Sequence, residues 1–166
     1  MLFLLFQTLE YRSKNLNKSY GTNCAVKNMS FTFETGKIYG LLGPNGAGKS
    51  TTMNIVTGCL AATSGDVAVC GYDIYKQAVN AKACIGYLPE QPPVYNDMTV
   101  YEYLDFVGEA KKIKGKERKH QIEQVLLQTD LYPVKDRLIG NLSKGYKQRV
   151  GVAQAMLGNP PILIFD

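Results

Sequence analysis

Residues 43–51 decide the fold, and their sequence is Gly43, Pro44, Asn45, Gly46, Ala47, Gly48, Lys49, Ser50 and Thr51. Every fixed position of the pattern G-x-x-x-x-G-K-[ST] is filled. The glycines let the main chain bend closely around an anion, so that backbone N–H groups can hold phosphate charges. Lys49 can reach the β- and γ-phosphates as a candidate catalytic residue, and the Ser50 hydroxyl can bind Mg²⁺. The stretch therefore predicts that these nine residues bind a nucleoside triphosphate with Mg²⁺.

The segments on both sides of this loop supply the context that the pattern requires. Residues 38–42 are an apolar run that predicts a buried strand, and the apolar residues after the loop suit a helix packed on a sheet. A predicted strand at 26–34 precedes this run through a tight turn. Further on, the sequence predicts a turn at 63–66, a short strand at 67–70 and a strand in the apolar run 84–88. A chance Gly-rich turn at the loop is the disfavoured alternative.

A second apolar run, residues 162–165, is followed by Asp166. A continuous run of this kind is typical of a strand buried on both faces of a parallel sheet. Open α/β sheets bind ligands at the carboxyl edge of their strands, where Asp166 would lie. A carboxylate in this place helps to hold the Mg²⁺ that a phosphate-loop serine contacts. Ser50 and Asp166 are therefore the candidate metal ligands.

From Thr99 onward the period of the apolar residues changes from two to 3.6, which predicts three helices. Thr99 and Glu102 have the spacing of a capping box at the start of the first helix. The predicted apolar stripes are Val100, Tyr103, Leu104 and Val107 in the first helix, Ile122, Val125, Leu126 and Thr129 in the second, and Val150, Ala153 and Leu157 in the third, which runs from about 143 to 157. Ser143 is a good N-cap for the third helix, and Gly145 leaves its start open to a phosphate group.

The composition, 45% apolar and 20% charged in 166 residues, is that of one globular domain. The net charge of +5 is concentrated in residues 111–119, where no aromatic residues interleave, so a solvated surface is favoured over a nucleic-acid site. His120 is predicted to be solvated in the same run. Residues 1–6 are too short to span a bilayer and predict an edge strand or an irregular start, not a targeting signal. The cysteines lack C-x-x-C spacing and predict small buried residues in a reducing compartment: Cys24, Cys59, Cys70 and Cys84.

The order of these motifs resembles that of the nucleotide-binding subunit of an ATP-binding-cassette (ABC) transporter. In that family an aromatic residue upstream of the phosphate loop stacks on adenine, and Tyr20 stands in this place. Residues 43–51 correspond to the Walker A loop, residues 142–146 to the signature sequence and residues 162–166 to the Walker B strand. The resemblance covers nearly the whole chain.

The signature sequence departs from the family pattern at two positions. It is usually Leu-Ser-Gly-Gly-Gln, so Lys144 and Tyr146 differ. Ser143 and Gly145, which the resemblance implies as phosphate contacts, are kept.

The glutamine loop of the family also has a variant form here. Glu90 stands where glutamine is expected, and Gln91 follows one position later. The resemblance implies that either side chain reaches the metal or the attacking water, so both are candidate catalytic residues. Together with the variant signature, this loop resembles the export type of cassette that carries drugs and polysaccharides.

The resemblance implies an α/β fold, with a P-loop NTPase core, an antiparallel β region near the N-terminus and a helical insert at about 99–158. Residues 1–166 would form one ABC ATPase domain that is incomplete at its C-terminus. The implied activity is binding and hydrolysis of Mg-ATP, which drives export through a separate integral-membrane permease while the chain lies on the cytoplasmic face. Two subunits would pair head to tail, each ATP lying between one phosphate loop and residues 143–145 of the other subunit. No nucleic-acid partner is expected.

Two other classes of protein share a phosphate loop. A soluble cassette ATPase acting on ribosomes or nucleic acid is permitted by the charge of +5. A kinase or GTPase is disfavoured by the signature helix. The family places a catalytic glutamate directly after the Walker B aspartate and a histidine that senses the γ-phosphate further on, so the sequence resembles a truncated cassette. We therefore expect the chain alone to bind nucleotide with little or no ATP hydrolysis.

Overall fold

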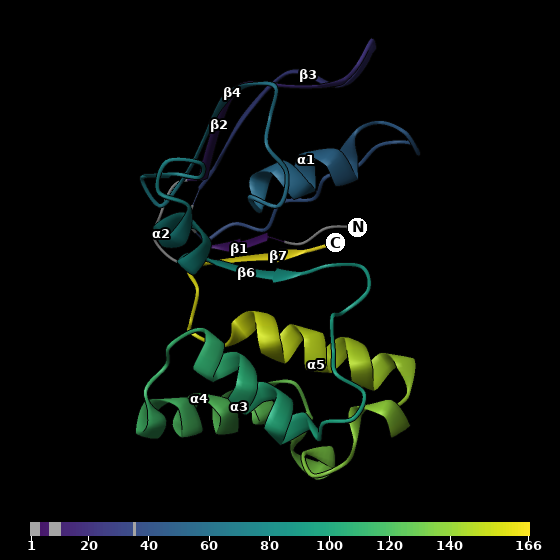
Figure 1. Ribbon diagram of the computed structural model, residues 1–166, viewed down its shortest axis with the longest axis vertical. Helices are drawn as coiled ribbons and strands as arrows, with labels where there is room; N and C mark the ends of the chain where they lie inside the picture. Colours follow the sequence, from purple (N-terminus) through teal and green to yellow (C-terminus); the bar gives the residue numbers. More distant parts are fainter. Residues whose placement is uncertain (1–3, 7–10, 35) are drawn as a thin grey trace. The chain divides into compact units, whose positions relative to one another are not determined.

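The computed structural model describes residues 4–6, 11–34 and 36–166, which form two compact units. The sheet unit holds the described residues up to Tyr87 together with Pro161–Asp166. The helical unit holds Leu88–Pro160. Figure 1 shows the chain entering the helical unit after β6 and leaving it before β7.

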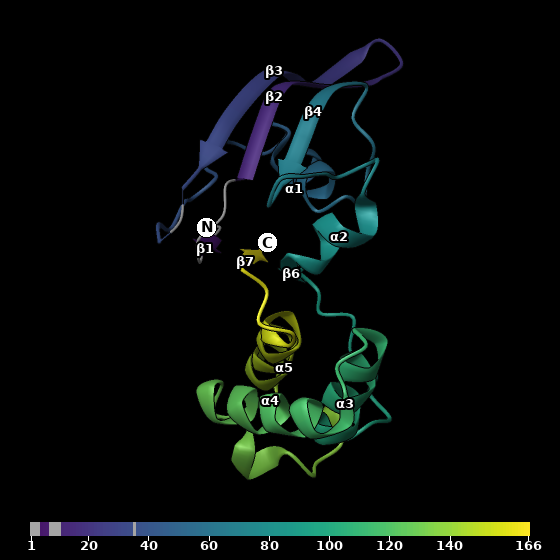
Figure 2. The same ribbon diagram turned by 90° about the vertical axis from the view of Figure 1, so that its left-hand side faces the viewer.

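A four-stranded antiparallel sheet with the order β3-β2-β4-β5 forms one layer of the sheet unit (Figure 2). Its strands are β2 (Tyr11–Tyr20), β3 (Asn23–Phe33), β4 (Ser64–Val69) and β5 (Tyr72–Asp73). In the β2–β3 hairpin, Tyr11 lies opposite Phe33 and Tyr20 opposite Asn23. Gly21 takes a φ of +58° in the two-residue turn. The strand predicted at 26–34 is thus confirmed as part of a longer strand.

The turn predicted at 63–66 is wrong for most of its length, because β4 already begins at Ser64. Gly65 has a φ of +95°, and a Cβ atom there would lie 2.4 Å from the carbonyl oxygen of Asn15. The glycine therefore allows the close approach of two strand backbones. A glycine between serine and aspartate is typical both of a turn and of a strand that closely approaches a neighbouring backbone. The sequence pattern alone does not distinguish these two structures.

A second sheet, with the order β1-β7-β6, contains β1 (Leu4–Phe6), β6 (Ile85–Leu88) and β7 (Ile162–Phe165). The strands predicted at 84–88 and 162–165 are confirmed. Ile162 and Ile164 are buried, whereas Leu163 and Phe165 are only half-buried, and β1 pairs with β7 in antiparallel orientation. The predicted burial of β7 on both faces is therefore wrong. The predicted parallel pairing holds on one side only, because β6 runs beside β7 in the same direction while β1 is antiparallel to it (Figure 1).

Residues 38–42 form no strand, so that prediction is also wrong. The side chains of Ile38 and Leu42 are 58% and 78% exposed, while Tyr39 and Leu41 pack on the apolar core. Strand pairing depends on partners that lie far away in the sequence. Because β1 and β6 take both sides of β7, no place beside β7 remains for residues 38–42.

The helices of the sheet unit are α1 (Lys49–Val56) and α2 (Ala78–Ala83). The buried residues of α1 are Thr52, Met53, Ile55 and Val56, which include the three apolar residues predicted to pack on the sheet. The Tyr11 hydroxyl donates a hydrogen bond to the Val56 carbonyl oxygen at 3.2 Å, and burial raises the pKa of Tyr11 well above its usual value. This bond joins the end of α1 to the start of β2.

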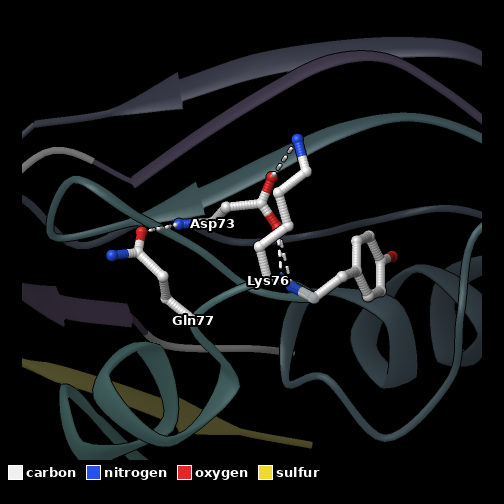
Figure 3. A network of polar contacts seen from close by, with 4 residues as sticks. Asp73, Lys76 and Gln77 are labelled. Carbon is white, nitrogen blue, oxygen red and sulfur yellow. Dashed lines mark hydrogen bonds and ion pairs between the residues drawn. The ribbon is translucent and has the colours of Figure 1, made fainter.

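Asp73 holds the turn between β5 and α2 (Figure 3). Its carboxylate accepts hydrogen bonds from the backbone N–H groups of Tyr75 at 2.9 Å and Lys76 at 2.8 Å, and these bonds lower the pKa of Asp73. The Gln77 side-chain oxygen accepts a bond from the Asp73 N–H at 3.3 Å. The turn presents Tyr75, whose hydroxyl accepts a hydrogen bond from the Ala62 N–H at 3.0 Å. The segment that follows α1 is thereby tied to this turn.

The burial predicted for the four cysteines is wrong. Cys24 and Cys59 are exposed, Cys70 and Cys84 are half-buried, and all four are free thiols. Cys24 lies on β3, which is an edge strand of its sheet, so it has fewer neighbours than a residue in a central strand. Residues 4–6 form an edge strand, one of the two alternatives predicted for the N-terminal run. Residues 1–3 lie outside the described residues.

The helical unit contains α3 (Val100–Ala110), α4 (Gly115–Gln128) and α5 (Lys144–Met156), with two short 3₁₀ helices at Tyr132–Val134 and Ile139–Asn141. The three predicted helices are thus confirmed. Their predicted apolar stripes are buried in one core, except that Val107 is half-buried against it and Thr129 is a buried polar residue outside the cluster. The predicted capping box is present at the start of α3: Thr99 N–H donates to Glu102 Oε2 at 2.8 Å, and Glu102 N–H donates to Thr99 Oγ1 at 3.2 Å.

Most of the basic run 111–119 is exposed, as predicted, and so is His120. Lys111 has an additional structural role, because its Nζ donates to the Leu157 carbonyl oxygen at 2.6 Å and to that of Gln154 at 3.2 Å. The residue as a whole is exposed, but protein surrounds its amine, and this desolvation lowers the pKa of Lys111 to about 8. Lys111 therefore caps the C-terminal end of α5.

Candidate nucleotide-binding site

The predicted phosphate-binding loop leads from residues 38–42 into α1. Gly46 and Gly48 have φ values of +83° and +80°, which residues with a Cβ atom rarely adopt. The Ala47 N–H donates to the Pro44 carbonyl oxygen at 3.2 Å and bends the loop back on itself. Gly48 is the N-cap of α1, and no side chain caps this helix. The first N–H groups of α1 therefore lack a protein side-chain acceptor and are available to an anion.

Gly48 also seats the loop against β3. A Cβ atom at this position would lie 2.3 Å from the Ala25 carbonyl oxygen and 3.4 Å from Cγ2 of Val26. Only glycine fits so close to a neighbouring backbone. Asn23, the cross-strand partner of Tyr20, precedes Ala25 by two residues, so the hairpin end with Tyr20 lies about 7 Å along the strand from this contact.

Lys49 reaches back across the loop. Its Nζ donates hydrogen bonds to the carbonyl oxygens of Gly43 and Pro44, both at 2.7 Å. The positive charge of Lys49 is therefore held at the loop, within reach of an anion bound to the N–H groups of α1. The neighbouring Ser50 is exposed and Thr51 is half-buried.

Tyr20 is the last residue of β2, and its side chain is 51% exposed. An aromatic ring at the tip of a hairpin, open to solvent and next to the loop, is suited to stacking on a flat ligand group. The sheet unit thus brings Tyr20 and residues 43–51 to one region through the contact of Gly48 with β3.

Asp166 directly follows β7, as predicted, and its side chain is exposed. Its charge acts on Tyr87 in the neighbouring β6: burial, and then the Asp166 carboxylate, raise the pKa of Tyr87. Within the described residues there is no hydrogen bond between Asp166 and Ser50.

The predicted metal ligands are oxygen donors of the type that Mg²⁺ prefers, a hydroxyl at Ser50 and a carboxylate at Asp166. Among residues 4–6, 11–34 and 36–166, no group of three or more His, Cys, Asp or Glu side chains could hold a metal ion. Mg²⁺ usually takes one or two protein oxygens and completes its shell with phosphate and water. The residue types therefore suit a nucleotide-bound Mg²⁺ better than a metal held by protein alone.

The two glutamine-loop candidates lie in the helical unit. Glu90 and Gln91 are in the irregular segment after β6, and both are exposed. This segment is tied to α5, because Gln148 Nε2 donates to the Glu90 carbonyl oxygen at 3.0 Å. Gly151 leaves room for the same segment, since a Cβ atom there would lie 3.0 Å from Pro92 Cβ. Sequence reasoning missed Gln148, whose only signal is its place near the start of the signature helix.

The signature residues form the exposed start of α5. Ser143 is the N-cap, as predicted, and its Oγ accepts a hydrogen bond from the Tyr146 N–H at 3.4 Å, which is long for such a bond. Ser143, Lys144 and Gly145 are all exposed, and a Cβ atom at Gly145 would meet only Ser143 Oγ, at 4.0 Å. The end of this helix is therefore accessible to a ligand or a second chain.

The sequence profile of the protein family described as "ABC transporter" matches residues 26–166. This chain belongs to the ABC transporter family. The matched range contains the loop at 43–51, the signature at 142–146 and the Walker B strand. The resemblance inferred from the motif order is confirmed, and with it the ATP-binding character of the family.

Curated relatives of this ABC chain include a resistance protein and a probable multidrug transporter protein. The linearmycin resistance ATP-binding protein LnrL of Bacillus subtilis is 36% identical over 155 residues, which cover 93% of this chain and 50% of LnrL. The probable multidrug ABC transporter ATP-binding protein YbhF of Escherichia coli is 37% identical over 142 residues, which cover 86% of this chain and 25% of YbhF. The chain spans half or less of the length of these relatives.

Solved structures of ABC proteins share the fold. MJ1267, an ATP-binding cassette of an ABC transporter, superposes with a TM-score of 0.78 at 29% identity, over 93% of this chain and 67% of MJ1267. The ATP-binding subunit of another ABC transporter gives a TM-score of 0.77 at 24% identity, a likeness that shows the fold alone. The predicted α/β P-loop NTPase fold is therefore confirmed. Among the described residues, no helix has the length and apolar character needed to cross a membrane.

Proposed function

We propose that this chain binds Mg-ATP at residues 43–51 and belongs to a protein that hydrolyses ATP to drive export through a separate membrane permease. The observation that carries the proposal is the uncapped start of α1, which Gly48 seats against β3 while Lys49 stands across the loop. Protein-supplied N–H groups and one lysine are the donors that a triphosphate requires. The names of relatives in linearmycin resistance and in a lipopolysaccharide export system support the export direction.

The predicted site residues of the sheet unit have defined roles in this proposal. The N–H groups of the loop hold the phosphates, and Lys49 exchanges its two carbonyl acceptors for β- and γ-phosphate oxygens. Tyr20 stacks on the adenine ring. Ser50 and Asp166 hold the Mg²⁺, which when bound neutralises charge on the phosphates.

The helical unit supplies the residues that act on hydrolysis and on partners. Glu90 or Gln91 orients the attacking water, and Gln148 fixes their segment to α5. The exposed residues 143–145 contact the γ-phosphate held by a second ATPase subunit in a head-to-tail dimer. Residues 90–105 transmit the closing of this dimer to an integral-membrane permease. The subunit therefore works at the cytoplasmic face of the membrane. No nucleic-acid partner is required.

Replacement of Lys49 tests the nucleotide site. In isothermal titration with Mg-ATP, Lys49→Ala should weaken binding by at least about 100-fold, because charge-assisted hydrogen bonds contribute about 1.5–3 kcal/mol each. Lys14→Ala removes the same charge from an exposed position on β2 and serves as the matched control. Equal affinity in the Lys49→Ala protein and the control would overturn the proposal.

Sedimentation of the unchanged protein and of a Ser143→Arg variant, each with and without ATP, tests the dimer. ATP should shift the protein to a dimer, and Ser143→Arg should prevent this shift while leaving ATP affinity of the monomer within about twofold, because the bulky charged side chain blocks only the partner's phosphate. A normal ATP-dependent dimer in the Ser143→Arg protein would contradict the role in trans.

A further inference from the structure

Tyr20 has a cationic neighbour that no motif predicts. The Lys18 Nζ lies 5.1 Å from the centroid of the Tyr20 ring, within the range of a cation–π contact. The same Nζ donates a hydrogen bond to the Ala61 carbonyl oxygen at 2.8 Å. Lys18 is half-buried, and its ammonium contacts both the Tyr20 ring and the Ala61 carbonyl oxygen. These two contacts restrict its movement.

The acceptor of Lys18 is itself fixed. Thr63 N–H donates to the Asn17 carbonyl oxygen at 2.9 Å, and Ser19 N–H donates to Thr63 Oγ1 at 3.0 Å. The residue between Ala61 and Thr63 is also bonded: Ala62 N–H donates to the Tyr75 hydroxyl at 3.0 Å. Tyr75 belongs to the turn that Asp73 holds (Figure 3). The segment that begins at Ala61 is therefore a rigid base from which Lys18 orders the ring of Tyr20.

The end of β2 that carries Tyr20 is linked to the phosphate loop through β3. Tyr20 pairs with Asn23, and Ala25, two residues further along β3, touches Gly48 of the phosphate loop. A tyrosine ring has two faces, and Lys18 covers one of them. With 51% of its surface exposed, Tyr20 keeps room for a flat group on its other face.

We infer that Lys18 is a positioning residue for ATP: its ammonium, anchored on Ala61, holds the ring of Tyr20 so that adenine stacks on the opposite face. The inference rests on the proposed function, in which Tyr20 contacts the base. Ordering a side chain before the ligand arrives removes part of the entropy lost on binding. Lys18 touches neither the phosphates nor the reacting atoms and acts only through Tyr20.

The test compares two probes in isothermal titration with Mg²⁺ present, ATP and inorganic tripolyphosphate, which lacks the base. Lys18→Met should weaken ATP about threefold, the scale of one exposed cation–π contact, and leave tripolyphosphate affinity unchanged. Lys18→Arg should restore ATP affinity, because a guanidinium makes the same contact. In the Tyr20→Ala background, Lys18→Met should have no further effect on ATP. Lys14→Met is the control for loss of a charge from β2.

The possible failures can be told apart. An equal loss for ATP and tripolyphosphate, or a further loss in the Tyr20→Ala background, would mean that Lys18 acts through charge or folding and would overturn the inference. Unchanged ATP affinity in Lys18→Met, together with the expected loss in Lys49→Ala, would overturn the inference and leave the proposed function standing. Unchanged affinity in Lys49→Ala would overturn the proposed function itself.

Discussion

Two helices, α3 in the helical unit and α1 in the sheet unit, begin in opposite ways. In the helical unit, Thr99 and Glu102 bond to each other's backbone N–H groups, so the start of α3 is supplied with acceptors by the protein. In the sheet unit, α1 begins at Gly48 with no capping side chain and no acidic residue in its first turn. An isolated helix start left in this way loses stabilisation that a cap would provide. The difference is that the protein itself supplies acceptors to the start of α3, whereas the first N–H groups of α1 are left available to an anion, as the proposed function requires.

The signature helix α5 is intermediate between these two cases. Ser143 caps it, but the bond to the Tyr146 N–H is 3.4 Å long, and the first residues of the helix are exposed. At its other end, Lys111 bonds to the carbonyl oxygens of Leu157 and Gln154. The helix is therefore fixed at its C-terminal end and accessible at its N-terminal end.

The largest effect is expected for Gly48→Ala, which attacks the uncapped helix start directly. The added Cβ would lie 2.3 Å from the Ala25 carbonyl oxygen, and the φ of +80° disfavours alanine, so the loop must leave its seat on β3. We expect Mg-ATP affinity to fall by at least about 100-fold and the unfolding free energy by about 1–3 kcal/mol. Titration calorimetry and urea unfolding measure the two effects.

Gly46→Ala is the matched control for this change. Gly46 has nearly the same φ, +83°, but nothing lies within 4 Å of the added Cβ. It therefore carries the backbone strain without the collision. If both variants lost ATP affinity equally, backbone strain rather than the contact with β3 would be what holds the loop.

A smaller effect is expected for Thr99→Ala, which removes the cap from α3. Loss of an N-cap hydroxyl lowers the unfolding free energy by about 1 kcal/mol. Because the capping box supports only α3 and its core, ATP affinity should stay within about twofold. Thr99→Ser keeps the hydroxyl and should retain most of the stability. A large loss of ATP affinity in Thr99→Ala at full folding would contradict the contrast between the two helix starts.

The smallest effect is the dependence on pH that Lys111 produces at the end of α5. Its folded pKa of about 8 lies below the usual 10.5, so between these pH values the unfolded chain binds a proton that the folded chain does not. The contribution of Lys111 to stability should therefore rise as pH increases from about 8 to 10.5. Allowing for solvent around this exposed residue, the rise is on the order of 1 kcal/mol.

Urea unfolding followed by circular dichroism at several pH values measures this rise. Lys111→Met should remove it, whereas Lys116→Met, an exposed lysine on α4, should leave it in place. The same slope in both variants would show that another group titrates in this range.

The two units also differ in how much of their secondary structure can be predicted from the sequence. The helices of the helical unit follow from local signals, such as the spacing of Thr99 and Glu102 or of Val150, Ala153 and Leu157, and the structure has all three. Residues 38–42 carry an equally clear apolar run, yet form no strand, because a strand needs a partner that the run itself does not specify. Propensity acts within a few residues, whereas strand pairing is set by the whole chain.

The candidate site shows the same division. The loop at 43–51, the N-cap Ser143 and the position of Asp166 after a strand are readable in the sequence, because each depends on its immediate neighbours. The bond of Gln148 to Glu90 and the bond of Lys18 to Ala61 are not. Gln148 and Glu90 are 58 residues apart, and Lys18 depends on an acceptor 43 residues away. Such contacts become visible only once the fold has brought the segments together.

The two carbonyl hydrogen bonds of Lys49 have a consequence for the heat of nucleotide binding. The ammonium already donates to Gly43 and Pro44 at 2.7 Å, so under the proposed function a triphosphate would displace two acceptors that are in place. The part of the binding enthalpy that comes from Lys49 is then the difference between its hydrogen bonds to phosphate and its hydrogen bonds to the two carbonyl oxygens. The released carbonyl groups must bond to water or to new donors. The proposed function therefore implies that these two bonds, which hold Lys49 at the loop, reduce the net enthalpy of triphosphate binding.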